Sequence, residues 1–112
     1  MRENKLAELS LDLAVKGVEL TGEIEGHYAL KIQFERSVTS IGANIHEANY
    51  AHSTADFIAK LQIALKECYE TEYWLELLHE SNMIDDAAFE SIYFDCQEII
   101  RILVSITKTQ KE

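Results

Sequence analysis

Apolar residues recur along this 112-residue chain at the spacing of an α-helix. Steps of three and four residues place side chains on one side of a helix, whereas a strand would show strict alternation. Four such stretches predict helices over about 4–21 or slightly further, 28–50, 54–81, and from about 85 onwards. The clearest stripe lies in the last stretch and comprises Ile92, Cys96, Ile99, Leu103 and Ile106. Four long helices with short joints predict an all-α, antiparallel, up-down-up-down four-helix bundle.

Glycine and serine mark the predicted joints. Gly22 and Gly26 bracket the first joint, because glycine is the usual residue past a helix end. Ser53 followed by Asp56 predicts a helix start, since the hydroxyl caps free backbone N–H groups and the acid lies at the positive end of the helix. The chain has no proline and no Gly/Ser-rich run that could serve as a linker. We therefore expect residues 1–112 to form a single domain.

The N-terminus and the cysteines indicate the compartment. No apolar run follows the first residues as in a signal peptide, and no stretch approaches the ~20 apolar residues that span a bilayer. We expect a cytoplasmic protein with no membrane partner. Cys68 and Cys96 lie on apolar stripes, so we interpret them as reduced core residues rather than as a disulfide or metal ligands.

Two of the predicted helices carry a second apolar face. The residues concerned are Leu11, Val15 and Val18 in the first helix, and Ile63, Trp74 and Leu77 in the third. One face of each helix packs into the bundle. The other face should be buried against another molecule, because large apolar patches are rarely exposed on a soluble monomer. The pattern therefore predicts a homo-oligomer with these residues in its interface.

Polar residues accompany the core stripes of the second and third helices. Ser40, Asn44 and Glu47 follow one edge of the second helix, and Glu72 interrupts the apolar stripe of the third. We interpret them as a hydrogen-bonded network between these two helices, in preference to a ligand-binding or catalytic role. Because burial of an unpaired carboxylate is costly, Glu72 should have a partner or a raised pKa.

The same region resembles a known family. The stretch Ser40–Ala48 reads S-I-G-A-N-I-H-E-A, and the stretch Asp56–Leu75 begins with Asp-Phe and continues through Ile63-Ala64 to Glu70 and Glu72. Both resemble the four-helix-bundle family that includes the 23S rRNA intervening-sequence proteins, and more distantly the accessory protein of diversity-generating retroelements. The resemblance implies a four-helix bundle assembled as a homopentamer, with no established enzymatic activity.

The charge of the chain argues against simple nucleic-acid binding. Twenty acids against ten bases give a net charge of −10, and affinity for phosphates comes mainly from Lys and Arg. The bases are also scattered along the sequence. Assembly could still gather some of them into a basic ring, for which the candidates are Lys31, Arg36, Lys60 and Lys66.

The chain holds little that points to catalysis. Glu76 and His79 form one E-x-x-H pair, whereas ferritin-like metal proteins use two such pairs and further glutamates. We expect no metal and no cofactor. Three hypotheses result: a non-enzymatic oligomeric scaffold or adaptor, which we prefer; an RNA- or DNA-binding accessory protein that uses a basic ring; and, least favoured, a ferritin-like metal enzyme.

Overall fold

A computed structural model describes residues 4–111, and the side chains of residues 5–108. Its four α-helices are α1 (Asn4–Glu23), α2 (Tyr28–Ala48), α3 (Thr54–Glu80) and α4 (Asp86–Lys111), and the described residues contain no strand. These bounds agree with the predicted ones to within about two residues, the usual uncertainty of a helix end. The all-α prediction is confirmed. None of the described helices is long and apolar enough to cross a membrane.

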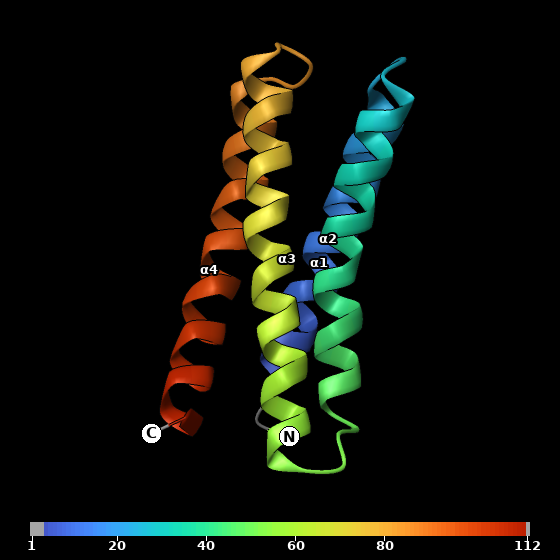
Figure 1. The fold of residues 1–112 in the computed structure, drawn as a ribbon. Helices are drawn as coiled ribbons and strands as arrows, with labels where there is room; N and C mark the ends of the chain where they lie inside the picture. The colour runs from blue at the N-terminus through green and yellow to red at the C-terminus, as the bar shows by residue number, and fades with distance from the viewer. Residues whose placement is uncertain (1–3, 112) are drawn as a thin grey trace.

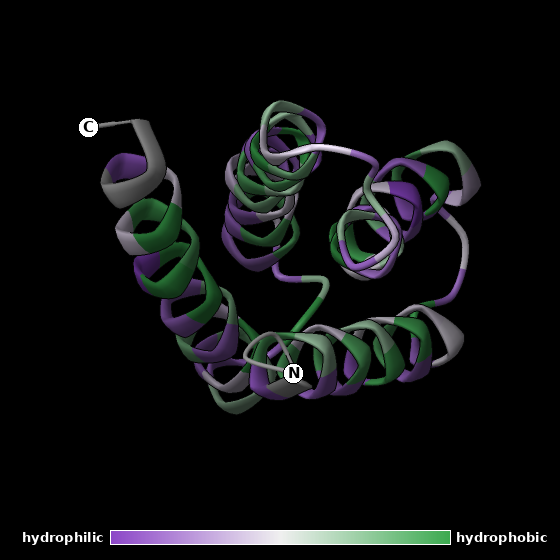
Figure 2. Cartoon of the chain, turned by 90° about the horizontal axis from the view of Figure 1, so that it is seen from below, coloured by the Kyte–Doolittle hydropathy of each residue, from purple (hydrophilic) through white to green (hydrophobic). Residues whose placement is uncertain are grey.

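The helices form an up-down-up-down bundle. Consecutive helices run in opposite directions, so both ends of the chain lie at the same end of the bundle (Figure 1). Each helix packs against the next, and α4 packs against α1, while neither diagonal pair approaches closely along the described backbone. Seen along its length, the bundle has its helices arranged around a shared interior (Figure 2). The molecule measures 43 × 20 × 19 Å, so its length is that of its longest helix.

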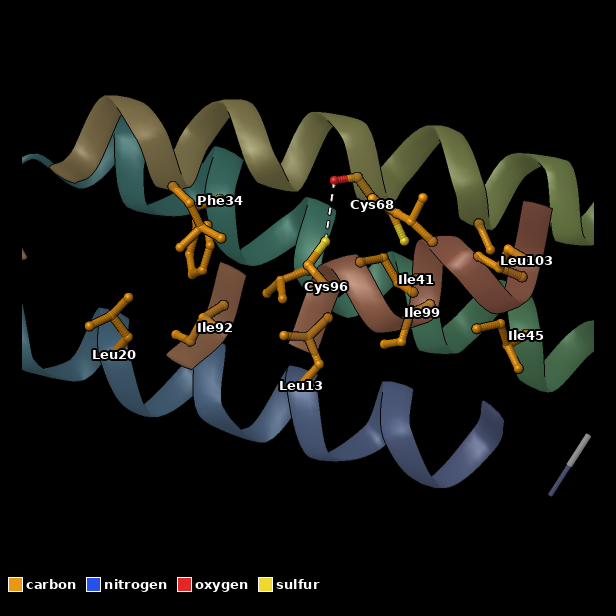
Figure 3. Packing of buried hydrophobic residues seen from close by; sticks show 14 of the residues in the cluster. Leu13, Leu20, Phe34, Ile41, Ile45, Cys68, Ile92, Cys96, Ile99 and Leu103 are labelled. Carbon is orange, nitrogen blue, oxygen red and sulfur yellow. Dashed lines mark hydrogen bonds between the residues drawn. The ribbon is translucent and has the colours of Figure 1, made fainter. Parts of the chain in front are cut away.

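The predicted stripes form the core. In α2, Phe34, Val38, Ile41 and Ile45 are fully buried, and the α4 stripe is buried from Ile92 to Leu103. Figure 3 shows these side chains meeting residues of α1 and α3 in the interior. Cys68 and Cys96 are free thiols in the same interior, and the Cys96 Sγ donates to the Cys68 carbonyl at 3.5 Å. The cysteines are thus core residues, as the stripes predicted.

The helix ends follow their local sequences with one exception. The Ser53 hydroxyl accepts a hydrogen bond from the Asp56 backbone N–H at 3.1 Å, which confirms the predicted start of α3. Gly26 has a φ of 72°, in the left-handed region that glycine tolerates best. Gly22, however, lies inside α1, which continues to Glu23, so only the second of the two glycines belongs to the joint.

Two glycines allow α1 and α2 to approach closely. A Cβ atom at Gly17 would lie 2.7 Å from Val38 Cγ1, and one at Gly42 would lie 3.3 Å from Ser10 Oγ. Small residues at these positions bring the two helix backbones together. Residues of α2 between Thr39 and His46 also form one wall of a surface groove with α1.

Candidate functional site

The polar edge of α2 is held mainly within its own helix. Ser40 Oγ donates to the Arg36 carbonyl at 2.7 Å, and Asn44 Nδ2 donates to the Ser40 carbonyl at 2.9 Å. Such bonds to the carbonyl one turn back are typical of Ser and Asn inside helices. Glu47 alone of the three predicted residues bonds across to α3, where its carboxylate accepts from Lys60 Nζ at 3.0 Å.

Glu72 lies at a different seam from the one predicted. Its carboxylate accepts a hydrogen bond from Gln97 Nε2 of α4, and it makes no hydrogen bond to α2 among the described contacts. Burial raises the Glu72 pKa, and the nearby Glu76 raises it further. Glu72 thus has both a partner and a raised pKa, where its burial called for one or the other, but it bonds to α4 and does not join Ser40, Asn44 and Glu47 in a network between α2 and α3.

A different polar pair lies between α2 and α3. Ser37 and Thr71 are both fully buried, and their hydroxyl oxygens lie 3.0 Å apart. Ser37 Oγ donates to the Phe34 carbonyl at 3.0 Å, so the Thr71 hydroxyl can donate to Ser37 Oγ or to the Glu67 carbonyl, 2.8 Å away. Ser37 precedes Ser40 by three residues, on the same edge of α2 as the predicted polar residues, but Thr71 was missed. The position of Thr71 on the apolar stripe of α3 was the signal that could have predicted its burial.

Arg36 extends this seam to the surface. Its guanidinium bonds the Glu70 carboxylate, and its Nη1 lies 3.6 Å from Glu67 Oε2. Glu70 also accepts from Trp74 Nε1 at 3.0 Å, and the Trp74 and Arg36 bonds together hold its pKa below the ordinary value. Glu67 Oε1 is buried and accepts no hydrogen bond from the described residues. The seam is therefore polar, and each of the other carboxylate oxygens of Glu67 and Glu70 is either bonded, paired with Arg36 or accessible to solvent.

The candidate interface residues differ in exposure. Leu11, Val15, Val18 and Ile63 are exposed, with Leu11 at 64%. Trp74 is half-buried against the core and bonded to Glu70, and Leu77 is half-buried as well. The first helix therefore presents its second apolar face fully, and the third helix presents its second face only in part.

A groove separates α1 from α2 on the surface. It is a hollow of about 440 Å³, which we name the α1–α2 groove, lined by Ala7, Ser10, Leu11 and Ala14 of α1 and by Thr39, Gly42, Ala43 and His46 of α2. The lining contains no carboxylate and consists largely of small side chains. Leu11 forms its exposed apolar rim. The motif Ser40–Ala48 thus contributes three residues to a groove rather than to a polar network.

The four basic candidates do not gather on one protomer as unpaired cations. Lys31 Nζ donates to the Ile24 carbonyl at 2.7 Å, Lys60 pairs with Glu47, and Arg36 pairs with Glu67 and Glu70. The positive charge of Lys66 acts on Glu70, whose pKa it helps to lower. Three of the four bases are therefore bonded to a carbonyl or carboxylate oxygen, and the charge of the fourth, Lys66, acts on Glu70.

The E-x-x-H pair does not converge. His79 Nε2 lies 2.7 Å from Asp86 Oδ1 and its ring stacks on Phe89, whereas Glu76 accepts from the Tyr93 hydroxyl at 3.4 Å. Within residues 4–111 no group of three or more His, Cys, Asp or Glu side chains is placed to hold a metal ion.

Comparison with known proteins identifies relatives of the chain. It is similar to a crystal structure from Bacteroides thetaiotaomicron VPI-5482, described as a protein of unknown function from the S23 ribosomal protein family. The two are 48% identical with a TM-score of 0.87, over 92% of this chain and 98% of that one. No curated protein matches this chain. The family model of the 23S rRNA-intervening sequence protein matches residues 2–105, and the chain therefore belongs to that family.

Proposed function

We propose that this protein is a non-enzymatic, homo-oligomeric scaffold whose copies meet at the α1–α2 groove. The observation that carries the proposal is an apolar groove without carboxylates on a chain of net charge −10. Copies of such a chain repel one another, so a surface between copies is most favourable where acids are missing. The small side chains of the lining let a second helix approach closely.

Five copies are the expected number, because the family resemblance implies a pentamer. A five-fold ring requires a heterologous contact, in which one surface of a copy meets a different surface of the next. We place the opposing surface on the outer side of α3 around Ile63, which is exposed on a helix diagonal to α1. Each copy would then offer a groove on one side and an apolar ridge on the other.

The remaining hypotheses receive less support. Lys31, Arg36 and Lys60 are engaged by oxygen atoms, which lowers the positive potential available to a phosphate. Glu76 and His79 are bonded to separate partners, so neither is aimed at a shared reaction centre. A scaffold needs neither a cation patch nor reactive side chains, and it agrees with both observations.

The test is the solution mass, measured by light scattering coupled to size exclusion across a dilution series. The wild-type mass should lie near five chains of 12.8 kDa at every concentration. Leu11→Asp places a charge in the groove and should lower the mass towards one chain, and Ile63→Asp should do the same. Both residues are exposed, so the substitutions should leave the helical circular dichroism spectrum unchanged.

Phe94→Asp is the matched control. Phe94 is 59% exposed on α4, lies outside the α1–α2 groove, and should tolerate the charge with no change in mass. A monomeric wild type would refute the scaffold proposal. A mass that falls with Phe94→Asp and holds with Leu11→Asp would refute the assignment of the groove.

A further inference from the structure

The seam between α1 and α4 is hollowed along most of its length. Three adjoining hollows of about 460, 200 and 170 Å³ follow it from Leu9 to the joint between α3 and α4. The first two share Lys16, and the second and third share Leu20, Glu23 and Ala88. We name this row of adjoining depressions the α1–α4 groove.

Its chemistry differs from that of the α1–α2 groove. Its accessible apolar lining is Leu9 and Val15 at the wider end, whereas Leu20 and Ile92 lie buried at its floor. Its acids are Asp12, Glu19, Glu23, Asp85 and Asp95. Lys16 is the one base in the lining of the three hollows. The other side of α1 borders a groove without a carboxylate, so the two grooves beside α1 differ in charge.

Lys16 already neutralises part of the negative charge of the groove. Its Nζ lies 2.6 Å from Asp95 Oδ2 and donates to Ser91 Oγ at 3.0 Å, which bridges α1 to α4 in the middle of the groove. Asp12, Glu19, Glu23 and Asp85 are exposed on either side of this bridge. A groove with an apolar wider end, acids on its rim and a lysine bound at its centre is suited to a ligand that brings further cations.

The length and walls of the groove indicate the shape of that ligand. Residues 9–23 of α1 span about 21 Å at the rise of an α-helix, which is about four turns. Both walls are helices, and a third helix packs readily into the furrow between two others when one of its sides is apolar.

We propose that the α1–α4 groove binds a cationic amphipathic helix of another protein, with its aliphatic side on Leu9 and Val15 and its Lys or Arg residues at the acidic rim. A second copy of this chain is a poor occupant, because its net charge is −10 and Arg36 and Lys60 are paired with carboxylates. Nucleic acids and anionic membranes are repelled by the same rim. The inference rests on the proposed scaffold function, for which it supplies the chemistry of the partner.

The experiment uses the full chain and a fluorescein-labelled synthetic peptide of about 16 residues, with leucines on one helical side and lysines on its flanks. Fluorescence anisotropy measures the dissociation constant. A scrambled peptide of identical composition keeps the charge and destroys the amphipathic side. The amphipathic peptide should bind, and the scrambled one should bind at least about tenfold more weakly.

Variants of the protein locate the contact. Glu19→Gln combined with Glu23→Gln should weaken binding about three- to tenfold, because two rim charges are lost. Lys16→Gln releases Asp95 for the peptide and should strengthen binding about two- to threefold. Glu80→Gln combined with Glu90→Gln removes the same charge from exposed positions outside the groove, and should have little effect.

Three outcomes would overturn the inference: no binding of the amphipathic peptide, equal binding of both peptides, or equal weakening by the two double variants. Light scattering on the same samples separates this result from the scaffold proposal. A pentamer that does not bind the peptide refutes only the proposed binding at the α1–α4 groove. A monomer that binds the peptide at this groove refutes only the oligomeric scaffold.

Discussion

Glu70 and Glu72 stand two residues apart in α3, and their surroundings move their pKa values in opposite directions. Glu70 faces α2, where hydrogen bonds from Trp74 and Arg36 stabilise its carboxylate and lower its pKa. Glu72 faces α4, where burial and the charge of Glu76 raise its pKa despite the bond from Gln97. A step of two residues turns a helix by about 200°, so neighbouring acids enter different environments.

This difference predicts opposite effects of the same substitution. At about pH 7, Glu72→Gln should raise the melting temperature, because it removes a charge that the folded state disfavours. Glu70→Gln should lower it, with a loss of about 1 kcal/mol for a half-exposed ion pair and hydrogen bond. Thermal melts by circular dichroism over a pH series test both.

The pH dependence supplies the control. A raised folded pKa means that Glu72 is protonated in both folded and unfolded states below its ordinary value near 4.5, so the gain from Glu72→Gln should vanish there. The stabilising effect of Glu70 is present above its ordinary pKa and is lost as pH falls through the lowered folded pKa, so the loss from Glu70→Gln should vanish at still lower pH. If both substitutions changed the melting temperature in the same direction at about pH 7, this account would be contradicted.

Single residues also show where sequence reasoning fails. The stripe of α3 correctly indicated that Glu72 is close to the core, and burial required a partner, but Thr71 and Glu72 face different neighbours, α2 and α4. Which of two adjacent positions faces which helix depends on the rotation of α3 about its axis. That rotation is set by packing against α2 and α4 together, and it is not contained in the period of one helix.

At the scale of elements, the close approach of α1 to α2 depends on Gly17. A Cβ there would lie 2.7 Å from Val38 Cγ1, and the Val38 side chain is fully buried and β-branched, with little freedom to move away. Gly22 lies in the same helix with no atom within 4 Å of its Cβ position. Substitution of Gly17 therefore changes both packing and helix propensity, whereas substitution of Gly22 changes helix propensity alone.

Gly17→Ala should lower the free energy of unfolding by about 1 kcal/mol, since overpacking of about 1–3 kcal/mol exceeds the gain in helix propensity of about 1 kcal/mol. Gly22→Ala should raise it by up to about 1 kcal/mol, because only the propensity changes. Urea titrations measure both. Val38→Ala added to Gly17→Ala should cost less than the sum of the single changes; an additive result, or a stabilising Gly17→Ala, would show that α1 shifts freely.

The elements themselves were predictable for a physical reason. Helix period, the Ser53 cap and the left-handed Gly26 are local features, and each depends on residues within one or two turns. Gly22 was assigned to the joint because glycine often ends a helix, but its left-handed conformation was not needed there, and α1 continues for one more residue. Each groove beside α1 is formed by residues of two helices, and the period of one helix does not determine how two helices pack. The sequence therefore predicted that Leu11 is exposed but not that it borders a groove.

At the scale of the whole molecule, α1 borders two grooves of opposite character. The α1–α2 groove lacks carboxylates and suits a surface between like-charged copies, whereas the α1–α4 groove has an acidic rim and suits a cationic partner. The net charge of −10 affects association at both grooves, but in opposite directions. It opposes assembly of the protein with itself and favours attraction of a basic helix.

Salt should therefore change the two associations in opposite directions. Raising NaCl from about 50 mM to about 500 mM shortens the Debye length from more than 10 Å to a few ångströms, which screens the repulsion between copies and the attraction for the peptide. The oligomer should resist dilution better at high salt, and the amphipathic peptide should bind more weakly. Light scattering and anisotropy on the same samples measure both. If high salt dissociated the oligomer and released the peptide together, ion pairs would dominate both contacts, and the assignment of the uncharged groove to self-association would be wrong.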